Sequence, residues 1–467
     1  MQKTDYNNLF NDERLSSRGH NLLRSLFKVP TRSIQSLSVT RAEQKAYYRF
    51  LNNRKVDESL LSDELGLRCA KAVKDRVVLC IQDTTEINLA SHTNRLKPNS
   101  GIGPIDAVKK GLGFKIHPCL VVDAATGFPY GYAGIDIYNR AELQKMPYHK
   151  LRKLSIESKE SGKWIRGNQR AEQYLQEAKS VIIIQDREGD IYEQFTEDAL
   201  PENAHLLIRC KYNRYLSDND RLWSVLSGKE VAGIYRTIIQ ADSHKKTSRR
   251  EALMEVRVAK IKFRCPEKKV KGTAAFSSEV YAIEVKEITE NIKDPIHWRL
   301  LTTWPVKGFE GAQQIIEWYT CRWMIEEVFK VLKKECYNIE GSELEQGWAI
   351  RKLSIMILDT IIKVFQMLIA YNTEEGSDPI NSNTAFEEQE IKCLKIINKN
   401  MQGETIKQSN PHSIDNLKGA VWTIARIGGW KGYSSQRRPG ATTLINGLQK
   451  FYNYFEGYTL EKDVGTR

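Results

Sequence analysis

Two short apolar runs, each ending in Gln-Asp, constrain the fold of this chain more than any other feature. Residues 77–81 lead through a glutamine into Asp83, and residues 181–184 lead through a glutamine into Asp186. Apolar runs of this length, bounded by polar residues, are typical of buried strands. In an open α/β sheet, the strand ends present side chains to a ligand. The pattern therefore predicts an α/β fold with two acids at its functional edge.

Residues 319–333 have the spacing of an amphipathic helix that carries a third acid. At about 100° per residue, one polar face would carry the side chains of Tyr319, Arg322, Glu326, Lys330 and Lys333. The residues on the opposite side are apolar and predict a buried face. A lone carboxylate among basic residues suits a metal-binding acid beside a phosphate backbone. The alternative is a solvated surface helix with i,i+4 ion pairs, such as that of Glu326 with Lys330.

The overall charge favours an acidic partner. At 467 residues the chain is long enough for two or three domains, and its hydrophobic fraction of 41% is ordinary for a globular protein. The net charge of +13 and the pI of about 9.1 point to nucleic acid, although many basic proteins do not bind DNA. Asp359, Lys363 and Gln366 interrupt the apolar stretch 353–371, which predicts a buried helix and no contact with a membrane.

The cysteines and the first residues predict a cytoplasmic protein. The eight cysteines contain no Cys-x-x-Cys pair and no close histidine partners, which favours reduced, mostly buried thiols over zinc sites or disulfides. The first residues contain no apolar segment typical of a secretion signal. With a DNA partner, the expected location is the bacterial cytoplasm, in association with the nucleoid.

The pattern along the chain predicts three regions. Residues 1–70 are expected to be helical and DNA-binding, with a first helix capped by Asn11 or Asp12 and a second opened by a capping box at Thr40, although their arginines could equally form a solvated surface. Residues 71–371 are expected to form the catalytic core, with strands at 76–89, 114–122, 130–137, 181–184 and 206–209. Alternating residues at about 212–300 predict an antiparallel insertion with one exposed face. Residues 372–467 are expected to be a helical dimerisation and end-binding region that follows a polar linker.

Asp83, Asp186 and Glu326 together form a candidate metal site. Three carboxylates from separate elements can hold two divalent ions about 4 Å apart, which serves phosphoryl transfer. Oxygen-only ligands favour two Mg²⁺ ions, with Mn²⁺ as a substitute. Each acid could instead be a helix cap or a turn residue, and the spacing alone does not prove that the three converge.

The motifs resemble those of the insertion sequence 4 family of cut-and-paste DDE transposases, which includes the transposase of transposon 5. The spacing Tyr319-(2)-Arg322-(3)-Glu326-(6)-Lys333 is similar to the Tyr-Arg-Glu-Lys motif of that family. The resemblance extends in order along most of the chain, through Gln82-Asp83-Thr84-Thr85, Glu160-Ser-Gly-Lys-Trp164, Asp186-Arg187-Glu188, Trp298-Arg-Leu-Leu-Thr302 and Ile424-Ala-Arg-Ile-Gly-Gly-Trp430.

The resemblance implies an RNase H-like core in which Asp83, Asp186 and Glu326 bind the metal ions. It implies a β-rich insertion between the second Asp and the Glu, with helical regions on both sides of the core. It implies that Tyr319, Arg322 and Lys333 contact the transposon-end backbone, and Lys330 is expected to join them from the same helix face. It further implies that Trp298 stacks on a base flipped out of the duplex, whereas the residue pattern alone allows a core tryptophan.

The expected function is that of a DNA transposase acting as a homodimer on double-stranded DNA. It would bind terminal inverted repeats, cleave both strands through a hairpin intermediate and join the 3′ ends to target DNA. The alternatives are a nuclease of the same fold without strand transfer, and a non-catalytic DNA-binding regulator derived from an insertion sequence.

Overall fold

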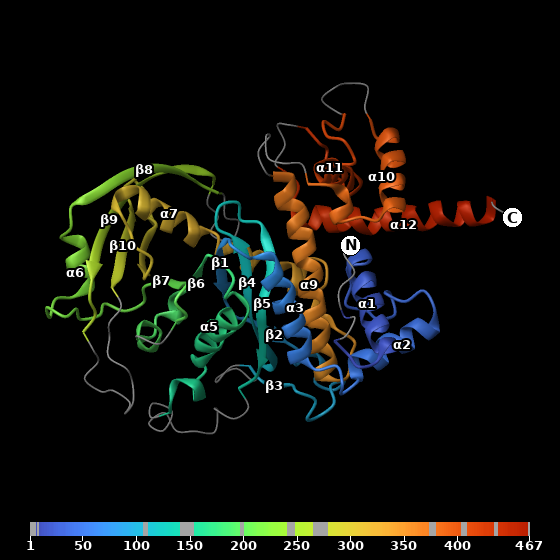
Figure 1. Ribbon diagram of the computed structural model, residues 1–467, viewed down its shortest axis with the longest axis horizontal. Helices are drawn as coiled ribbons and strands as arrows, with labels where there is room; N and C mark the ends of the chain where they lie inside the picture. Colours follow the sequence, from blue (N-terminus) through green and yellow to red (C-terminus); the bar gives the residue numbers. More distant parts are fainter. Residues whose placement is uncertain are drawn as a thin grey trace.

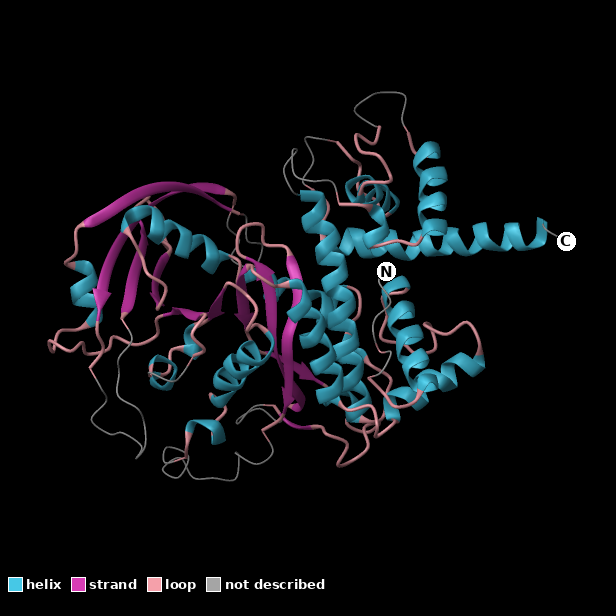
Figure 2. Ribbon diagram, viewed as in Figure 1, coloured by secondary structure: helices cyan, strands magenta, loops and turns pink. Residues whose placement is uncertain are grey.

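The computed structural model describes residues 6, 9–105, 111–140, 154–196, 200–240, 248–264, 279–372, 380–402, 409–433 and 438–465. They form a mixed α/β protein in which a large mixed sheet lies between an antiparallel extension and helical N- and C-terminal regions (Figures 1 and 2). The expected α/β class, with helical regions at both ends, is confirmed.

The two Asp-terminated runs form neighbouring parallel strands at the centre of the sheet. These are β1 (Val77–Gln82) and β6 (Ser180–Gln185), with Ile81 opposite Ile184. On the other side of β1 lie β4 (Leu112–Asp123) and then β5 (Pro129–Tyr138), both joined by antiparallel pairing. Strand β7 (Ala204–Arg209) extends the sheet beyond β6 in parallel. The acids therefore leave the same edge of the sheet side by side.

The strand expected at residues 76–89 is in fact two strands. Strands β1 and β2 (Thr85–Asn88) follow each other along one side of β4 in a single register, with Gln82 opposite Cys119 and Thr85 opposite Ile116. Between them, Asp83 lies opposite Pro118, which has no N–H to donate to a ladder, and Thr84 lies opposite His117. The pairing with β4 is therefore interrupted at Asp83. Strand β3 (Gly103–Pro104) also pairs with β4.

Helices cover both faces of the sheet, which explains why its central strands are continuously apolar. On one face Leu79 and Ile182 belong to a core that includes the long helix α9 (Gly347–Asn372). On the other face Cys80 and Ile183 pack in a second core with α3 (Glu58–Ala72) and α5 (Gly162–Tyr174). Each central strand thus contributes alternate residues to two cores.

The predicted antiparallel insertion is present, and it continues the central sheet. Its strands are β8 (Val231–Ile239), β9 (Arg250–Ile261), β10 (Val280–Glu287) and β11 (His297–Thr302), with α6 (Leu222–Ser227) before them. All four strands pair antiparallel, and β11 joins the insertion to β7. Residues in β9 alternate in burial, as expected for a half-exposed sheet. Residues 244–247 of the basic run lie outside the described residues.

The N-terminal helices begin where their capping residues predict. Helix α1 (Glu13–Lys28) is capped by Asp12, and α2 (Arg41–Asn52) is capped by Thr40.

Beyond α9, which ends where the polar linker was expected, the C-terminal region contains α10 (Glu388–Asn400), α11 (Leu417–Ile427) and α12 (Ala441–Gly465). Short 3₁₀ turns occur at Ala90–His92, Ile156–Ser158, Arg187–Gly189, Tyr192–Phe195, Ile339–Gly341 and Ser382–Thr384.

Helix α9 is long and apolar enough to cross a membrane by length and composition, and it was predicted to be a core helix. In its most apolar stretch 83% of the residues are buried within the protein. It stands between the sheet and the terminal helices (Figure 1).

The described cysteines are free thiols, and Cys69, Cys80, Cys119, Cys210 and Cys393 among them are buried, as expected.

Candidate active site

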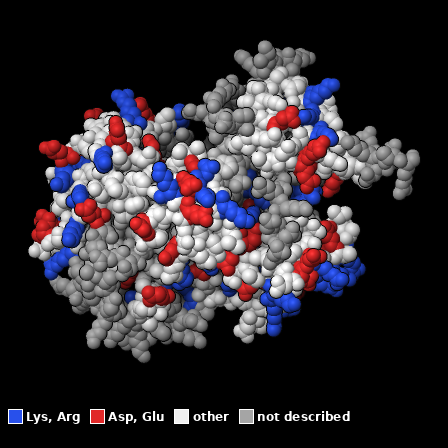
Figure 3. All heavy atoms as spheres, in the orientation of Figure 1, with Lys and Arg blue, Asp and Glu red and all other residues white. Residues whose placement is uncertain are grey.

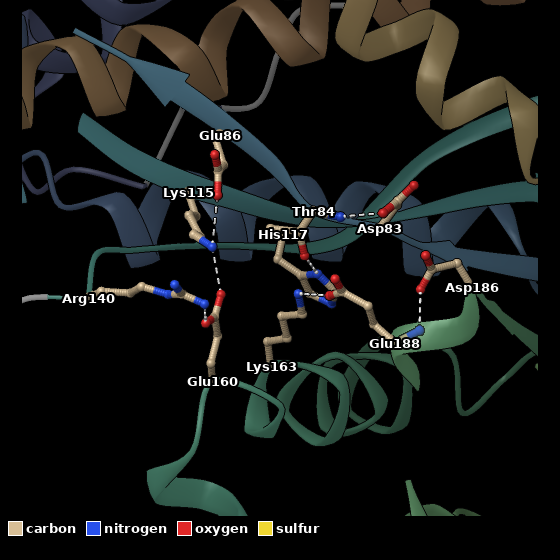
Figure 4. Close-up of polar contacts among 10 residues, drawn as sticks. All are labelled: Asp83, Thr84, Glu86, Lys115, His117, Arg140, Glu160, Lys163, Asp186 and Glu188. Carbon is tan, nitrogen blue, oxygen red and sulfur yellow. Dashed lines mark hydrogen bonds and ion pairs between the residues drawn. The ribbon is translucent and has the colours of Figure 1, made fainter. Parts of the chain in front are cut away.

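The parallel pairing of β1 and β6 brings the first two acids together. The register of Ile81 with Ile184 places Asp83 and Asp186 at equivalent positions just beyond the two strands, whose backbones lie about 4.8 Å apart in a sheet. Figure 4 shows both carboxylates at the ends of these neighbouring strands. The Asp83 carboxylate accepts a 2.7 Å hydrogen bond from the Thr84 N–H, and Asp186 accepts one of 2.8 Å from the Glu188 N–H.

The other acids that follow β6 are engaged elsewhere, so Asp186 alone turns toward Asp83. Asp190 is fully buried, accepts hydrogen bonds from the N–H groups of Lys211 and Tyr212, and pairs with Arg214. The Glu188 carboxylate forms a 2.9 Å ion pair with Lys163. Although burial alone would raise the pKa of Glu188, its hydrogen bond and ion pair with Lys163 hold that pKa below the usual range.

A buried cluster of side-chain amides joins the two strand ends directly beneath the acids. The Gln185 amide donates to the side-chain oxygens of Gln82 (3.0 Å) and Asn168 (3.2 Å). Asn168 in turn donates to Gln194, whose amide returns a 2.6 Å bond to Gln185. All four residues are buried, so each lost bond would leave an unsatisfied polar group. This amide cluster (Gln82, Asn168, Gln185 and Gln194) sets the spacing of the two strand ends.

A second polar network supports the same edge of the sheet and explains the Glu160–Trp164 motif. Glu160 pairs with Lys115 of β4 at 2.6 Å and also with Arg140, and Glu86 pairs with Lys115 at 3.0 Å (Figure 4). The ring of Trp164 packs edge-on against His117, whose Nδ1 lies 2.9 Å from the Thr84 hydroxyl. The motif therefore supports the Asp83 loop from behind.

The helix that carries Glu326 differs from the single helix expected at residues 319–333. Helix α7 (Gly308–Thr320) ends before it, α8 (Trp323–Lys330) contains Glu326, and a π-helix, η6, follows at Val331–Glu335. Between α7 and α8 the backbone makes i→i+3 hydrogen bonds, including Arg322 N–H to the Tyr319 carbonyl at 3.1 Å. Such a tightened turn advances about 120° per residue instead of 100°.

This tightened turn removes Tyr319 from the exposed face on which it was expected. Tyr319 is 3% exposed, and burial raises its pKa to about 12. Its ring packs edge-on against Trp298 with the ring centroids 5.5 Å apart, and the Arg209 guanidinium lies 6.0 Å from the centre of the Trp298 ring. Trp298, on β11, is partly buried. The structure therefore places Trp298 and Tyr319 together, adjoining Arg322.

Arg322 joins Asp83 to Glu326. Its Nη1 donates to Asp83 Oδ2 at 3.1 Å, and its Nη2 donates to Glu326 Oε1 at 2.5 Å. The Arg322 side chain is 11% exposed. Although burial alone would lower the pKa of Arg322, Tyr319, Glu326 and Asp83 hold that pKa above its usual range. The Arg322 guanidinium thus links the Glu326 carboxylate to the Asp83 carboxylate.

The protonation of Asp83 reflects the proximity of all three acids. The pKa of Asp83 is raised to about 6, chiefly by burial and also by the charges of Asp186 and Glu326, whereas the Thr84 N–H and Arg322 oppose the change. Like charges influence a carboxyl group in this way when they lie close to it. Carboxylates from β1, β6 and α8 therefore share one electrostatic environment.

The three acids have the right chemistry for magnesium, but they are not yet arranged around a common point. Their oxygens are hard ligands of the kind Mg²⁺ prefers, and their mutual repulsion favours a cation between them. Among the residues that the structure describes, no three Asp, Glu, His or Cys side chains form a group that could already hold a metal ion. Between Asp83 and Glu326, the guanidinium of Arg322 takes the place that a cation would occupy.

Other basic and aromatic residues of α8 and η6 surround this site. Lys330 is exposed and lies 3.9 Å from Glu327, whereas Lys333 pairs with Glu340 at 3.5 Å. Trp323 is 56% exposed, with the Arg322 guanidinium 5.2 Å from its ring centre. Trp323, Asn168 and Gln194 were not predicted from the sequence. The exposure of Trp323 beside Glu326 depends on how α8 packs, and Asn168 and Gln194 belong to no local motif in the sequence.

A basic face lies on α2, away from the acids. Arg41, Lys45 and Arg49 are exposed at successive i,i+4 positions, and Figure 3 shows basic side chains gathered over this helix. Two other arginines of the N-terminal region are engaged within the chain. Arg24 pairs with Glu387 at 2.9 Å, and Arg32 donates to the Gly341 carbonyl at 2.7 Å.

Residues 7–56 match the protein family described as transposase DNA-binding. The match covers α1 and α2 and includes the exposed basic face of α2. The chain therefore carries a transposase DNA-binding domain at its N-terminal end, in the region where sequence analysis expected DNA contact.

Removing the basic face should weaken DNA binding through lost phosphate contacts. For a variant with Arg41, Lys45 and Arg49 changed to Ala, we expect the slope of log K against log salt to become shallower by up to about 3. Fluorescence anisotropy with duplex DNA at several salt concentrations measures the slope. A matched variant with Lys71, Lys74 and Lys179 changed to Ala loses the same charge from exposed positions on α3 and just before β1 and β6. Equal effects of the two variants would contradict a DNA-binding role for α2.

Replacing Asp83 should stabilise the fold in a pH-dependent way. The folded protein disfavours the Asp83 carboxylate, because its pKa lies at about 6 instead of the usual 3.8. The penalty is absent below about pH 4, grows between pH 4 and 6 and is complete above pH 6, where it amounts to about 3 kcal/mol. Urea unfolding of Asp83→Asn should therefore show a gain in unfolding free energy at pH 8 that shrinks toward pH 5.

Asp123→Asn provides a control of opposite sign. Although burial alone would raise the pKa of Asp123, hydrogen bonds from Thr126, Tyr130 and Ala125 hold it below its usual value. The ionised form of Asp123 thus stabilises the fold, and this contribution is lost as the pH falls. Asp123→Asn should destabilise the protein most at neutral pH. A gain from Asp83→Asn that does not change with pH would contradict the assigned pKa.

Proposed function

We propose that this chain, which carries a transposase DNA-binding domain, is a DNA transposase of the DDE class that moves an insertion sequence by cutting and pasting. The observation that supports the proposal is the contact of Arg322 with both Asp83 and Glu326, together with the effect of the Asp186 and Glu326 charges on the pKa of Asp83. The transposase DNA-binding match at residues 7–56 adds the substrate class.

The strand order supports an RNase H-like assignment for the core. The strands run β5-β4-β1-β6-β7, with antiparallel pairing on one side of β1 and parallel pairing on the other. This arrangement places two acids at the carboxyl ends of adjacent parallel strands, where α/β sheets bind ligands. The insertion that supplies Trp298 falls between Asp186 and Glu326, in the position implied by the resemblance to the insertion sequence 4 family.

In this proposal Asp83, Asp186 and Glu326 hold two Mg²⁺ ions, for which Mn²⁺ can substitute. When bound, such a pair supplies an activated oxygen nucleophile and stabilises the leaving oxygen in phosphoryl transfer. The chain itself positions the reacting groups. The amide cluster holds the ends of β1 and β6, and the hydrogen bonds of Asp83 and Asp186 to backbone N–H groups orient their carboxylates.

The same site would serve successive steps because the nucleophile changes while the phosphoryl chemistry does not. Water would first nick one strand at each transposon end. The freed 3′-hydroxyl would attack the opposite strand to give a hairpin, a second water would open the hairpin, and the 3′-hydroxyl would join target DNA. Two ends must be held together, so a homodimer on terminal inverted repeats is part of the proposal.

Trp298 is the residue we assign to the hairpin step. A hairpin bends one strand tightly, and extruding a base relieves the bend at a cost of a few kcal/mol. Stacking on an aromatic ring can return about 1–3 kcal/mol of that cost. The Trp298 ring is partly exposed and adjoins Tyr319 and the Arg209 guanidinium.

Replacing Glu326 should abolish cleavage while DNA binding survives. We expect Glu326→Gln to lower cleavage of duplex DNA carrying the gene's own flanking sequence by at least about 10³-fold in Mg²⁺, because one metal ligand is lost. Glu327→Gln is the matched control, since this neighbouring carboxylate is 61% exposed on the same helix. Gel assays of cleavage and binding measure both effects. Cleavage by Glu326→Gln at the wild-type rate would contradict the proposal.

The same assay separates the alternative functions. A nuclease of this fold would cut the end DNA but would not join pre-cleaved ends to a target plasmid. A DNA-binding regulator would bind the ends without cutting them. Joining by the wild-type protein, lost in Glu326→Gln and retained in Glu327→Gln, is the outcome that a transposase requires.

Replacing Trp298 should affect hairpin formation more than nicking. We expect Trp298→Ala to reduce hairpin product about 10- to 100-fold, as the loss of one stacked base implies, while first-strand nicking changes little. Trp298→Phe, which keeps a ring against Tyr319, should recover much of the hairpin product. Denaturing gels resolve the two products. Equal loss of both steps, together with a lowered unfolding midpoint, would indicate that Trp298 serves only packing.

A further inference from the structure

Arg322 occupies the space between two of the proposed metal ligands. Its two Nη atoms bind Asp83 Oδ2 and Glu326 Oε1, so one guanidinium neutralises part of the charge of both acids. We propose that Arg322 is the resident counter-cation of the metal site in DNA-free protein, and that it leaves the acids for a DNA phosphate, so that DNA binds before metal. This inference rests on the proposed function for its DNA partner, whereas its metal-binding half stands independently.

The contacts of Arg322 and a bound metal ion exclude each other. Asp83 Oδ2 and Glu326 Oε1 are among the oxygens that a divalent ion would need, and both are engaged by N–H donors. A cation placed between the same oxygens would also lie within a few ångströms of the guanidinium charge, where repulsion is strong in a partly buried site. The Arg322 side chain is 11% exposed, so solvent screens this repulsion poorly.

The resting arrangement leaves Arg322 incompletely satisfied. Its Nε is buried and has no hydrogen-bond partner among the described residues. A guanidinium binds a phosphate through two parallel N–H bonds, a geometry for which arginine is better suited than lysine. A phosphate reaching this site could therefore take up the unpaired N–H donor as well as one donor released from a carboxylate.

The residues around Arg322 favour this exchange once a strand arrives. The Arg209 charge interacts with those of Asp186 and Arg322, Lys330 follows Glu326 by one turn on α8, and Trp323 offers an exposed ring next to the Arg322 guanidinium. A phosphate drawn to this region would compete with Asp83 and Glu326 for Arg322. Because each binding event removes an obstacle to the other, DNA and metal should raise each other's affinity by the same factor.

The consequence is a protein that binds metal weakly until it holds DNA. A site assembled only on the substrate would not cleave other nucleic acid by collision with a preloaded metal centre. The same contact explains why three close carboxylates are tolerated in the DNA-free fold. Arg322 thus acts as a positioning residue that holds Asp83 and Glu326 near their working places and sets the order of assembly.

The test is Mn²⁺ binding to the full-length protein without DNA, measured by isothermal titration calorimetry at pH 8. We expect Arg322→Ala to bind Mn²⁺ at least tenfold more tightly than wild type, and Arg322→Lys, which keeps the charge, to remain within about threefold of wild type. Lys334→Ala is the control, because it removes one exposed charge from η6 and should change the affinity less than twofold. The double variant Asp83→Asn/Arg322→Ala should lose the gain.

Equal Mn²⁺ affinity of wild type and Arg322→Ala would overturn the inference, as would a gain that persists in the double variant. If Arg322→Ala does not fold, as judged by circular dichroism, Arg322→Gln carries the same test. A second measurement adds duplex DNA with the gene's flanking sequence. The duplex should tighten Mn²⁺ binding to wild type at least tenfold and tighten binding to the Arg322 variant much less; equal tightening would also overturn the inference.

The two proposals can fail separately. If the protein never cleaves DNA, the proposed function fails, yet tighter Mn²⁺ binding by Arg322→Ala in DNA-free protein would still support a resident counter-cation. If cleavage depends on Glu326 while Mn²⁺ affinity is indifferent to residue 322, the transposase assignment holds and the ordered assembly does not.

Discussion

The rest of the structure depends on the parallel pairing of β1 with β6. This pairing places Asp83 and Asp186 at equivalent positions on adjacent strands, and every other part of the site is arranged around them. Pro118 of β4 lies opposite Asp83, where the pairing of β4 with β1 and β2 is interrupted. The amide cluster beneath them then joins the two strand ends through buried hydrogen bonds that are costly to break.

Bringing acids together in a partly buried place creates an electrostatic conflict. The raised pKa of Asp83 is a result of this conflict. Arg322 reduces the repulsion between the acids because it contacts both Asp83 and Glu326. Sites built for catalysis commonly hold such perturbed groups, because the arrangement that suits the bound state is strained without its ligand. In this protein the conflict would be relieved by different cations at different stages: a guanidinium before DNA binds, and metal ions afterwards.

Much of this arrangement could be predicted from local patterns. Asp12 and Thr40 begin α1 and α2 as their side chains indicate, and the apolar runs before Asp83 and Asp186 are buried strands. The alternation in residues 250–261 correctly indicated a half-exposed strand. The prediction that Tyr319 lies on an exposed helix face was wrong, because helical geometry at 100° per residue does not hold across the tightened turn between α7 and α8. The division of residues 76–89 into β1 and β2 was also not predicted, because the strand pattern continues through Asp83 and Thr84.

Local sequence patterns were enough to predict which strands end in Asp83 and Asp186 and where the N-terminal helices begin. These properties depend on neighbours within a few residues along the chain. The contacts of Asn168 and Gln194 with Gln185, of Trp298 with Tyr319, and of Arg322 with Asp83 and Glu326 arise from the folded chain alone. Those contacts join residues up to 239 positions apart, and no local propensity specifies a pairing at such a separation.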